Sequence, residues 1–245
     1  MKELIRRTLR RFGYDLHRYL PTSSPDAQLA QVLRTFGIDL VLDIGANTGQ
    51  YGQLLREIGY RGRIVSFEPL ADAHAALLAT SAADTRWTAA PRSAIGDHDG
   101  SIEINIAGNS ASSSVLDMLE SHRAAAPHSA YIGKDIVPIA RIDSAAPPLM
   151  AGAANVYVKI DTQGYETQVL AGGPATIAAA SAVQLELSLT PLYAGQPDFD
   201  AMLAAIAAHG MVLWAMWPGF ADPATGRILQ AEAIFARPER AIAGR

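Results

Sequence analysis

The 245-residue sequence predicts an α/β fold with a doubly wound, mostly parallel sheet. Apolar runs at residues 40–44 and 156–160 are typical of strands that are buried on both faces, as in a parallel sheet. Segments with helical periodicity separate the predicted strands, which is the alternation expected of βαβ units. The first run leads into a glycine turn and an amphipathic helix, an arrangement that presents backbone N–H groups to a ligand.

The first 20 residues predict a basic amphipathic helix. Six basic residues stand against two acidic ones there, although the whole chain carries a net charge of −4. Leu4, Ile5, Leu9, Phe12 and Leu16 recur near helical spacing, with arginines on the other face. This helix could lie on an anionic membrane surface, or pack on the core or on a second subunit of a homodimer. We expect residues 1–24 to be a helix and linker, and residues 25–245 to be a single domain.

The first half of this domain predicts two strands, each followed by a helix. Ser24 or Asp26 could cap a helix that runs to about Phe36. The further elements are a strand at 40–44, a helix at 49–58, a strand at 63–67, a helix at 72–79 and a short strand at 85–88. Residues 93–142 break this alternation, because 101–107 and 136–142 alternate in polarity around polar loops. We therefore expect antiparallel strands and loops inserted in the sheet or added at its margin.

The second half returns to the regular order. It predicts a strand at 156–161, a helix at 165–170, a strand at 182–187, a helix at 198–209, and two last strands at 211–216 and 229–236. Because ligands bind at the carboxyl ends of strands in such sheets, the residues that follow the strands are the candidates for a site.

The segment from Asp43 to Gly49, with Glu68, predicts the class of cofactor. Glu68 ends the second strand, where an acid can accept hydrogen bonds from the two hydroxyls of a ribose. A dinucleotide loop reads G-x-G-x-x-G, but here only Gly45 and Gly49 are present, and the Asp43 carboxylate would repel a pyrophosphate. A carboxylate suits the cationic end of S-adenosylmethionine instead. The alternative is that the two glycines serve only the turn.

Three motifs resemble those of the FkbM family of S-adenosylmethionine-dependent methyltransferases. They are Asp43-Ile-Gly-Ala-Asn-Thr-Gly-Gln50, Phe67-Glu68-Pro69, and Lys159-Ile-Asp-Thr-Gln-Gly-Tyr-Glu166. The similarity runs from about residue 41 to about residue 186. It implies the class I methyltransferase fold, a Rossmann-like sheet with a C-terminal antiparallel hairpin. Gln163 departs from the pattern, since the family usually has an acid there.

The resemblance and the fold assign candidate residues to the cofactor. These are Asp43, Gly45, Ala46, Asn47, Thr48, Gly49, Glu68 and Pro69, with Ser93, Ala94 and Asp97 beside the adenine. An acceptor hydroxyl must lose a proton, which requires a base or a metal. Asp161, at the end of its strand, is the candidate base. Lys159 could pair with it, and Glu186 could reach the same cleft; each could also be structural. 

Other residues could contact the acceptor. Ser112, Ser113 and Ser114 could bind a polyhydroxylated acceptor or form a solvated loop, and Glu166 could orient the catalytic groups. Asp161 and Glu186 could hold Mg²⁺, but two carboxylates without a third ligand are too few to predict a metal site. None of the six histidines falls in a metal-ligand spacing.

Composition excludes several classes of function. The chain has no cysteine, which removes disulfides, thiolate metal sites and cysteine nucleophiles. No apolar run approaches the roughly 18 residues that span a bilayer, and no signal peptide is evident. The negative net charge opposes nucleic-acid binding. We expect a cytoplasmic protein, with peripheral contact at the inner face of the membrane if the basic helix binds lipid.

The predicted function is therefore S-adenosylmethionine-dependent O-methylation of a hydroxyl group, with a sugar of a glycolipid or polysaccharide as the favoured acceptor. The alternatives are O-methylation of a polyketide-type natural product, an NAD-dependent oxidoreductase, and a non-catalytic cofactor-binding module. The missing middle glycine and the Lys159–Glu166 motif oppose the oxidoreductase. The intact loop, Glu68 and Asp161 oppose the non-catalytic module.

Overall fold

A computed structural model describes residues 2–242. Its main sheet has seven strands in the order β3-β2-β1-β7-β8-β10-β9. Their bounds are β1 Leu40–Ile44, β2 Arg63–Phe67, β3 Trp87–Ala89, β7 Val156–Ile160, β8 Ala180–Ser188, β9 Val212–Pro218 and β10 Gln230–Ala236. All neighbouring pairs are parallel except those made by β10, which runs antiparallel to β8 and β9. The predicted doubly wound sheet with a terminal antiparallel hairpin is confirmed.

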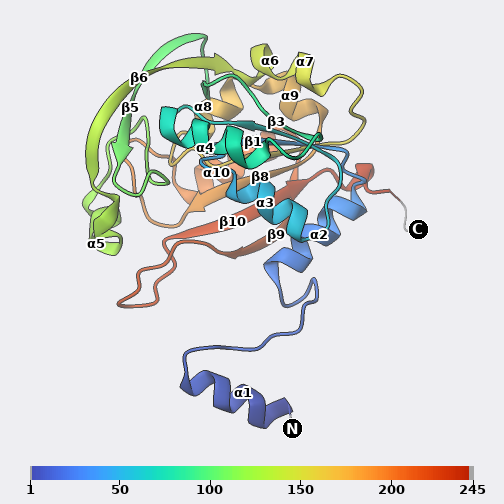
Figure 1. Cartoon of the computed structure of the whole chain (residues 1–245), viewed down its shortest axis with the longest axis vertical. Helices are drawn as coiled ribbons and strands as arrows, with labels where there is room; N and C mark the ends of the chain where they lie inside the picture. Colours follow the sequence, from blue (N-terminus) through green and yellow to red (C-terminus); the bar gives the residue numbers. More distant parts are fainter. Residues whose placement is uncertain (1, 243–245) are drawn as a thin grey trace.

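Helices cover both faces of this sheet (Figure 1). They are α2 Pro25–Thr35, α3 Gln50–Glu57, α4 Ala71–Ser81, α6 Ile142–Ala145, α7 Pro147–Met150, α8 Glu166–Ala171, α9 Pro174–Ala179 and α10 Phe199–Ala208. Ser24 caps α2 by accepting from the Ala27 N–H group, and Asp198 caps α10 in the same way through Ala201. A separate helix, α1 Lys2–Arg11, lies apart from the sheet (Figure 1).

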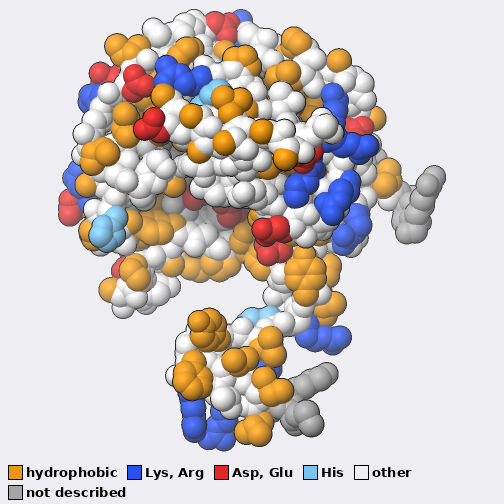
Figure 2. Space-filling model, in the orientation of Figure 1, with side chains coloured by type: hydrophobic (Ala, Val, Ile, Leu, Met, Phe, Trp, Pro, Cys, Tyr) orange, Lys and Arg blue, Asp and Glu red, His pale blue; other side chains and the backbone are white. Residues whose placement is uncertain are grey.

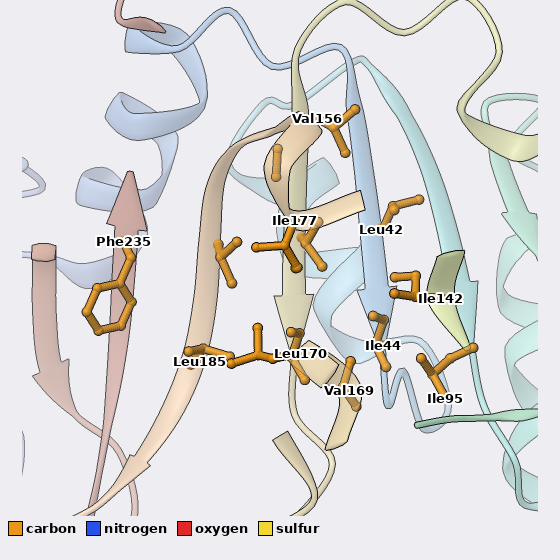
Figure 3. Close-up of a cluster of buried hydrophobic side chains, with 14 of the residues drawn as sticks. Leu42, Ile44, Ile95, Ile142, Val156, Val169, Leu170, Ile177, Leu185 and Phe235 are labelled. Carbon is orange, nitrogen blue, oxygen red and sulfur yellow. The ribbon is translucent and has the colours of Figure 1, made fainter. Parts of the chain in front are cut away.

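The apolar strands are buried on both faces, as their sequence predicts. Leu42, Ile44, Val158 and Leu185 belong to one buried cluster, which α9 and α10 cover (Figure 3). The residues of opposite parity, such as Val41 and Tyr157, join a second cluster with α2 and α3 on the other face. Successive side chains of a strand point to opposite faces of the sheet, so each strand contributes to both buried clusters.

The inserted region forms a sheet of its own instead of joining the main one. Its strands are β4 Ala94–Gly96, β5 Gly100–Ala107 and β6 Tyr131–Arg141, in the order β4-β6-β5. β5 and β6 are antiparallel, as expected, whereas β4 and β6 are parallel. Short helices α5 Glu120–Ala125, η1 Pro127–Ser129 and, near the C-terminus, η2 Pro238–Arg240 complete the elements. Among the described residues, no helix is long and apolar enough to cross a membrane.

Candidate active site

A cavity of about 380 Å³ opens where the carboxyl ends of β1, β2 and β7 meet the inserted sheet. Its walls come from segments far apart in the sequence. They include Ile44–Asn47 after β1, Gln50, Tyr51 and Leu54 of α3, Phe67–Leu70 after β2, Ser93–Ile95, Ser110, Ala111 and Ser113 of the insertion, Lys159, Asp161–Gln163 and Tyr165 around the end of β7, and Gln184 and Glu232. This is the position at which open α/β sheets bind their ligands.

The loop after β1 requires glycine at Gly45 for two reasons. Its φ is +80°, a conformation that L side chains rarely adopt, and a Cβ atom there would overlap the carbonyl oxygen of Asp161. The Asp161 N–H group also donates to the Ile44 carbonyl at 3.1 Å. The candidate cofactor loop and the candidate base are therefore in direct backbone contact.

Glu68 holds the cofactor loop in place from the end of β2. Its Oε2 accepts from the Asn47 N–H group and its Oε1 from the Leu70 N–H group, both at 2.8 Å. Burial raises the pKa of this carboxyl, which is only 5% exposed. Each oxygen keeps a second lone pair, so the side chain retains capacity for the two ribose hydroxyls predicted from the sequence.

Asp43 precedes the cavity-lining residue Ile44 but does not itself line the cavity. The residue is fully buried, and its Oδ2 accepts from the Ser66 hydroxyl at 3.0 Å. Its Oδ1 has no hydrogen-bond partner, but the Lys159 Nζ lies 3.9 Å away. Burial raises the pKa of Asp43, and the charge of Lys159 opposes that rise. Asp43 therefore lies behind Lys159, next to the cavity but not in its lining.

Lys159 and Asp161 form an ion pair at the cavity wall, with Nζ 3.0 Å from Oδ2. Burial opposes the charge of Lys159, but the carboxylates of Asp161 and Asp43 outweigh it and raise the pKa. The ammonium group also lies 5.3 Å from the centroid of the Tyr51 ring. The two residues predicted as a catalytic pair are thus brought together, and both line the cavity.

Glu186 lies behind Asp161 and does not line the cavity. Its Oε2 accepts from the Gln230 side-chain amide at 2.6 Å and from that of Gln163 at 3.3 Å. Burial, with the nearby Asp161 carboxylate second, raises the pKa of Glu186 well above its ordinary value. The structure places Glu186 in contact with the base through Gln163, not across the cavity from it.

Glu166 folds back on the loop that follows β7. Its Oε1 accepts from the N–H groups of Thr162 and Gly164 and from the Thr162 hydroxyl, at 2.9 to 3.2 Å. The side chain is 1% exposed, and burial raises its pKa to about 7. Glu166 therefore shapes the loop that carries Asp161 and does not reach the cavity itself.

Only one of the three predicted serines lines the cavity. Ser113 lines the cavity, while the hydroxyl of Ser114 donates to the Gln163 carbonyl at 2.7 Å and Ser112 is buried. Of the cofactor candidates, the cavity is lined by Gly45, Ala46, Asn47, Glu68, Pro69, Ser93 and Ala94. It is not lined by Thr48 and Gly49, which lead into α3, or by Asp97, which pairs with His98 at 2.7 Å.

Three polar side chains on neighbouring strands line the cavity: Lys159 of β7, Gln184 of β8 and Glu232 of β10. We call them the polar row, and the sequence analysis did not predict Gln184 or Glu232. Gln184 of β8 accepts from the hydroxyls of Tyr51 and Tyr157, both at 2.7 Å. It donates to Glu232 of β10 at 2.7 Å. Lys159 and Gln184 are register partners, so the row runs from β7 to β10 above the apolar core. The available signal was a polar residue within each otherwise apolar strand, at Lys159, Gln184 and Glu232.

Among the residues described by the structure, no group of three His, Cys, Asp or Glu side chains is placed to hold a metal ion.

Comparison with models of protein families gives a match over most of the chain. The sequence profile described as "Methyltransferase FkbM domain" matches residues 43–213, a stretch that includes the β1 and β7 loops. The comparison with curated proteins gave no match.

Solved structures share the general architecture at low similarity. Aeropyrum pernix fibrillarin, determined with S-adenosyl-L-methionine, is 11% identical, with 85% of this chain and 74% of that chain covered and a TM-score of 0.48. A putative tRNA (m1A22) methyltransferase of Streptococcus pneumoniae is 10% identical, with coverages of 87% and 69% and a TM-score of 0.47. A Mesorhizobium loti S-adenosylmethionine-dependent methyltransferase is 9% identical, with coverages of 89% and 100% and a TM-score of 0.45. At these values the likenesses carry no conclusion about activity.

Proposed function

Because the chain belongs to the FkbM methyltransferase family, whose methyl donor is S-adenosylmethionine, we propose that it methylates a hydroxyl oxygen of a sugar in a glycolipid or polysaccharide. One observation carries this proposal: Asp161, the candidate base, lines the same cavity as the cofactor loop and is in backbone contact with Gly45. A base at that point stands beside the bound methyl donor, which is where an acceptor hydroxyl must arrive.

The charge of the cavity supports this cofactor. Three acidic residues, Glu68, Asp161 and Glu232, line it against one basic residue, Lys159. When bound, S-adenosylmethionine supplies an electrophilic methyl group on a cationic sulfur. An acidic cavity attracts a ligand with a net positive charge and repels the pyrophosphate of NAD. The residues present therefore fit the methyl donor.

Each residue has a distinct task in the proposed reaction. Glu68 accepts from the ribose hydroxyls, and the loop at Gly45–Asn47 provides backbone groups for the rest of the cofactor. Lys159 and the amide of Gln163 each donate to one oxygen of Asp161 and so fix its orientation. With the methyl donor bound, Asp161 would accept the proton of the acceptor hydroxyl as its oxygen attacks the methyl carbon, while the bond from that carbon to sulfur breaks and S-adenosylhomocysteine leaves. Alignment of oxygen and carbon accounts for much of the acceleration in such a displacement.

The polar row supports a polyhydroxylated acceptor. Lys159 donates hydrogen bonds, Glu232 accepts them, and Gln184 can do both, and all three line the cavity next to Asp161. A sugar ring offers several hydroxyls that both donate and accept. These hydroxyls could exchange hydrogen bonds with the row, whereas an apolar polyketide ring could not.

The test is transfer of a labelled methyl group. The purified protein is incubated with methyl-labelled S-adenosylmethionine and, separately, with deoxysugar glycolipids, capsule-type polysaccharides, protein and RNA. The proposal predicts label in the glycans, recovered as an O-methyl sugar after acid hydrolysis. Label confined to protein or RNA, or recovered on nitrogen, would contradict the proposed acceptor while leaving the cofactor assignment intact.

A further inference from the structure

The N-terminal helix α1 does not pack on the rest of the protein. None of the four buried apolar clusters found among the described residues includes a residue before Leu29. Leu4 is 69% exposed and Phe12 is 74% exposed. Figure 1 shows the helix standing away from the sheet, joined to it by an extended segment. Apolar side chains are therefore left in water, which indicates a partner.

The side chains of α1 divide into two opposite faces. At roughly 100° per residue, Leu4, Ile5 and Leu9 fall on one arc, which Phe12 extends just beyond the helix. Arg6, Arg7 and Arg10 fall on the opposite arc, and Arg11 lies at the border between the two, about 20° from Leu4. Figure 2 shows hydrophobic side chains over much of this segment, with Lys and Arg side chains gathered at its far end.

The exposed arginines decide between the candidate surfaces. A groove that covers the apolar face of the helix leaves the exposed Arg7 and Arg11 in water. A lipid–water interface receives both, because the apolar arc enters the acyl boundary while the arginines extend to the phosphates. Phe12, Tyr14 and Tyr19 lie in the segment after α1 and are exposed. Aromatic rings of this kind favour the lipid–water interface.

We propose that residues 4–20 form a docking surface for an anionic lipid bilayer, with α1 lying in the plane of the interface. The charges are complementary, since the first 20 residues hold six basic and two acidic side chains while the chain as a whole is negative. The attraction is therefore local to this segment and is weakened by salt. The inference stands independently of methyl transfer, and it would bring the active site to a surface that carries lipid-linked acceptors.

Vesicle flotation of the full-length protein tests the proposal. The probes are phosphatidylcholine vesicles with and without phosphatidylglycerol, at low and high salt. We expect binding to the vesicles that contain phosphatidylglycerol, and a large loss of that binding at high salt. Arg7→Gln with Arg11→Gln is expected to lower the partition coefficient on the order of 30-fold, since each arginine near an anionic surface contributes about a factor of five.

Two further variants test the apolar face of α1 and the specificity of the charge effect. Leu4→Gln with Phe12→Gln tests the apolar face and is expected to reduce binding at least tenfold. The matched control is Arg61→Gln with Arg86→Gln, which removes the same charge from an exposed arginine cluster on the body. This control is expected to bind like the wild type. None of these side chains belongs to the buried clusters, so each variant should fold.

Three results would overturn the proposal. The first is absence of binding to vesicles that contain phosphatidylglycerol. The second is equal loss of binding in the control and in the Arg7, Arg11 variant, since general basic attraction would then suffice. The third is a stable dimer, seen by sedimentation equilibrium, that either helix variant dissociates while vesicle binding is absent. That outcome would assign α1 to a second copy of the chain. Binding of S-adenosylhomocysteine should be unchanged in every variant.

Discussion

The side-chain amide of Gln163 joins Asp161 to Glu186. Its Nε2 donates to Asp161 Oδ1 at 2.7 Å and to Glu186 Oε2 at 3.3 Å, while its Oε1 accepts from the Tyr193 hydroxyl at 2.7 Å. Gln163 holds this position with a φ of +55°. An amide can donate to two carboxyl groups at once. A carboxylate at this position has no N–H group to donate and would repel both of them. The departure from the family pattern thus has a defined place in the structure.

Gln163→Glu is predicted to destabilise the protein. A third acid would remove the donor shared by Asp161 and Glu186 and add a like charge, which should lower the free energy of unfolding by roughly 1–3 kcal/mol at pH 8. The loss should shrink at pH 5, where the acids are more protonated. Urea denaturation measures this, with Gln53→Glu at an exposed position of α3 as the control, expected within about 0.5 kcal/mol of wild type. Equal stability of Gln163→Glu and wild type at pH 8 would refute the bridging role.

Asp161→Asn is predicted to lower turnover while sparing cofactor binding. The asparagine keeps the size of the side chain but cannot accept the proton of the acceptor, and a general base contributes roughly 100-fold or more. The measurement is the rate of methyl transfer at saturating S-adenosylmethionine, together with the Kd for S-adenosylhomocysteine. Turnover within about threefold of wild type would show that Asp161 is not the base.

Glu166 is predicted to make stability fall as the pH rises from about 4.5 to 7. Its pKa rises from 4.5 to about 7 on folding, because the side chain is buried. The unfolded chain therefore ionises first, and the native state loses up to about 3 kcal/mol across this window. Glu166→Gln should flatten the pH dependence in denaturation experiments. An unchanged slope in the variant would mean that another carboxyl carries the effect.

Gly45→Ala is predicted to disrupt the contact between the β1 and β7 loops. The substitution adds backbone strain at φ +80° and a Cβ that overlaps the Asp161 carbonyl, at a combined cost of more than about 3 kcal/mol. Gly59→Ala is the matched control, because Gly59 has a φ of +91° but open space around it. It should cost only the strain, about 1–2 kcal/mol. Similar melting temperatures for the two variants would refute the close approach at Gly45.

Much of the fold could be predicted from the sequence, because its signals are local. The apolar runs at residues 40–44 and 156–160 became β1 and β7, and the glycine turn between β1 and α3 lies where the sequence placed it. The insertion was harder to predict. Alternation identified β5 and β6, but which strands pair depends on contacts across the chain, so the separate sheet and the parallel pairing of β4 were not foreseen.

The candidate site could be predicted only in part, for the same reason. Gly45, Glu68 and Asp161 follow strands directly, so the fold places them at one edge of the sheet. Glu232 reaches that edge only because β10 runs antiparallel to β8, and this depends on the register between the two strands. Glu186 and Glu166 are acids at plausible positions, but their side chains turn into the protein and serve the loops instead.

The central claim is that the cavity binds S-adenosylmethionine, and calorimetric titration with S-adenosylhomocysteine tests it most directly. NAD serves as the parallel control, and Glu68→Ala as the variant that removes the acceptor for the ribose. We predict micromolar binding of S-adenosylhomocysteine, no binding of NAD, and a loss of affinity of at least tenfold in the variant. Binding of NAD without S-adenosylhomocysteine, or equal affinity in wild type and Glu68→Ala, would contradict the claim.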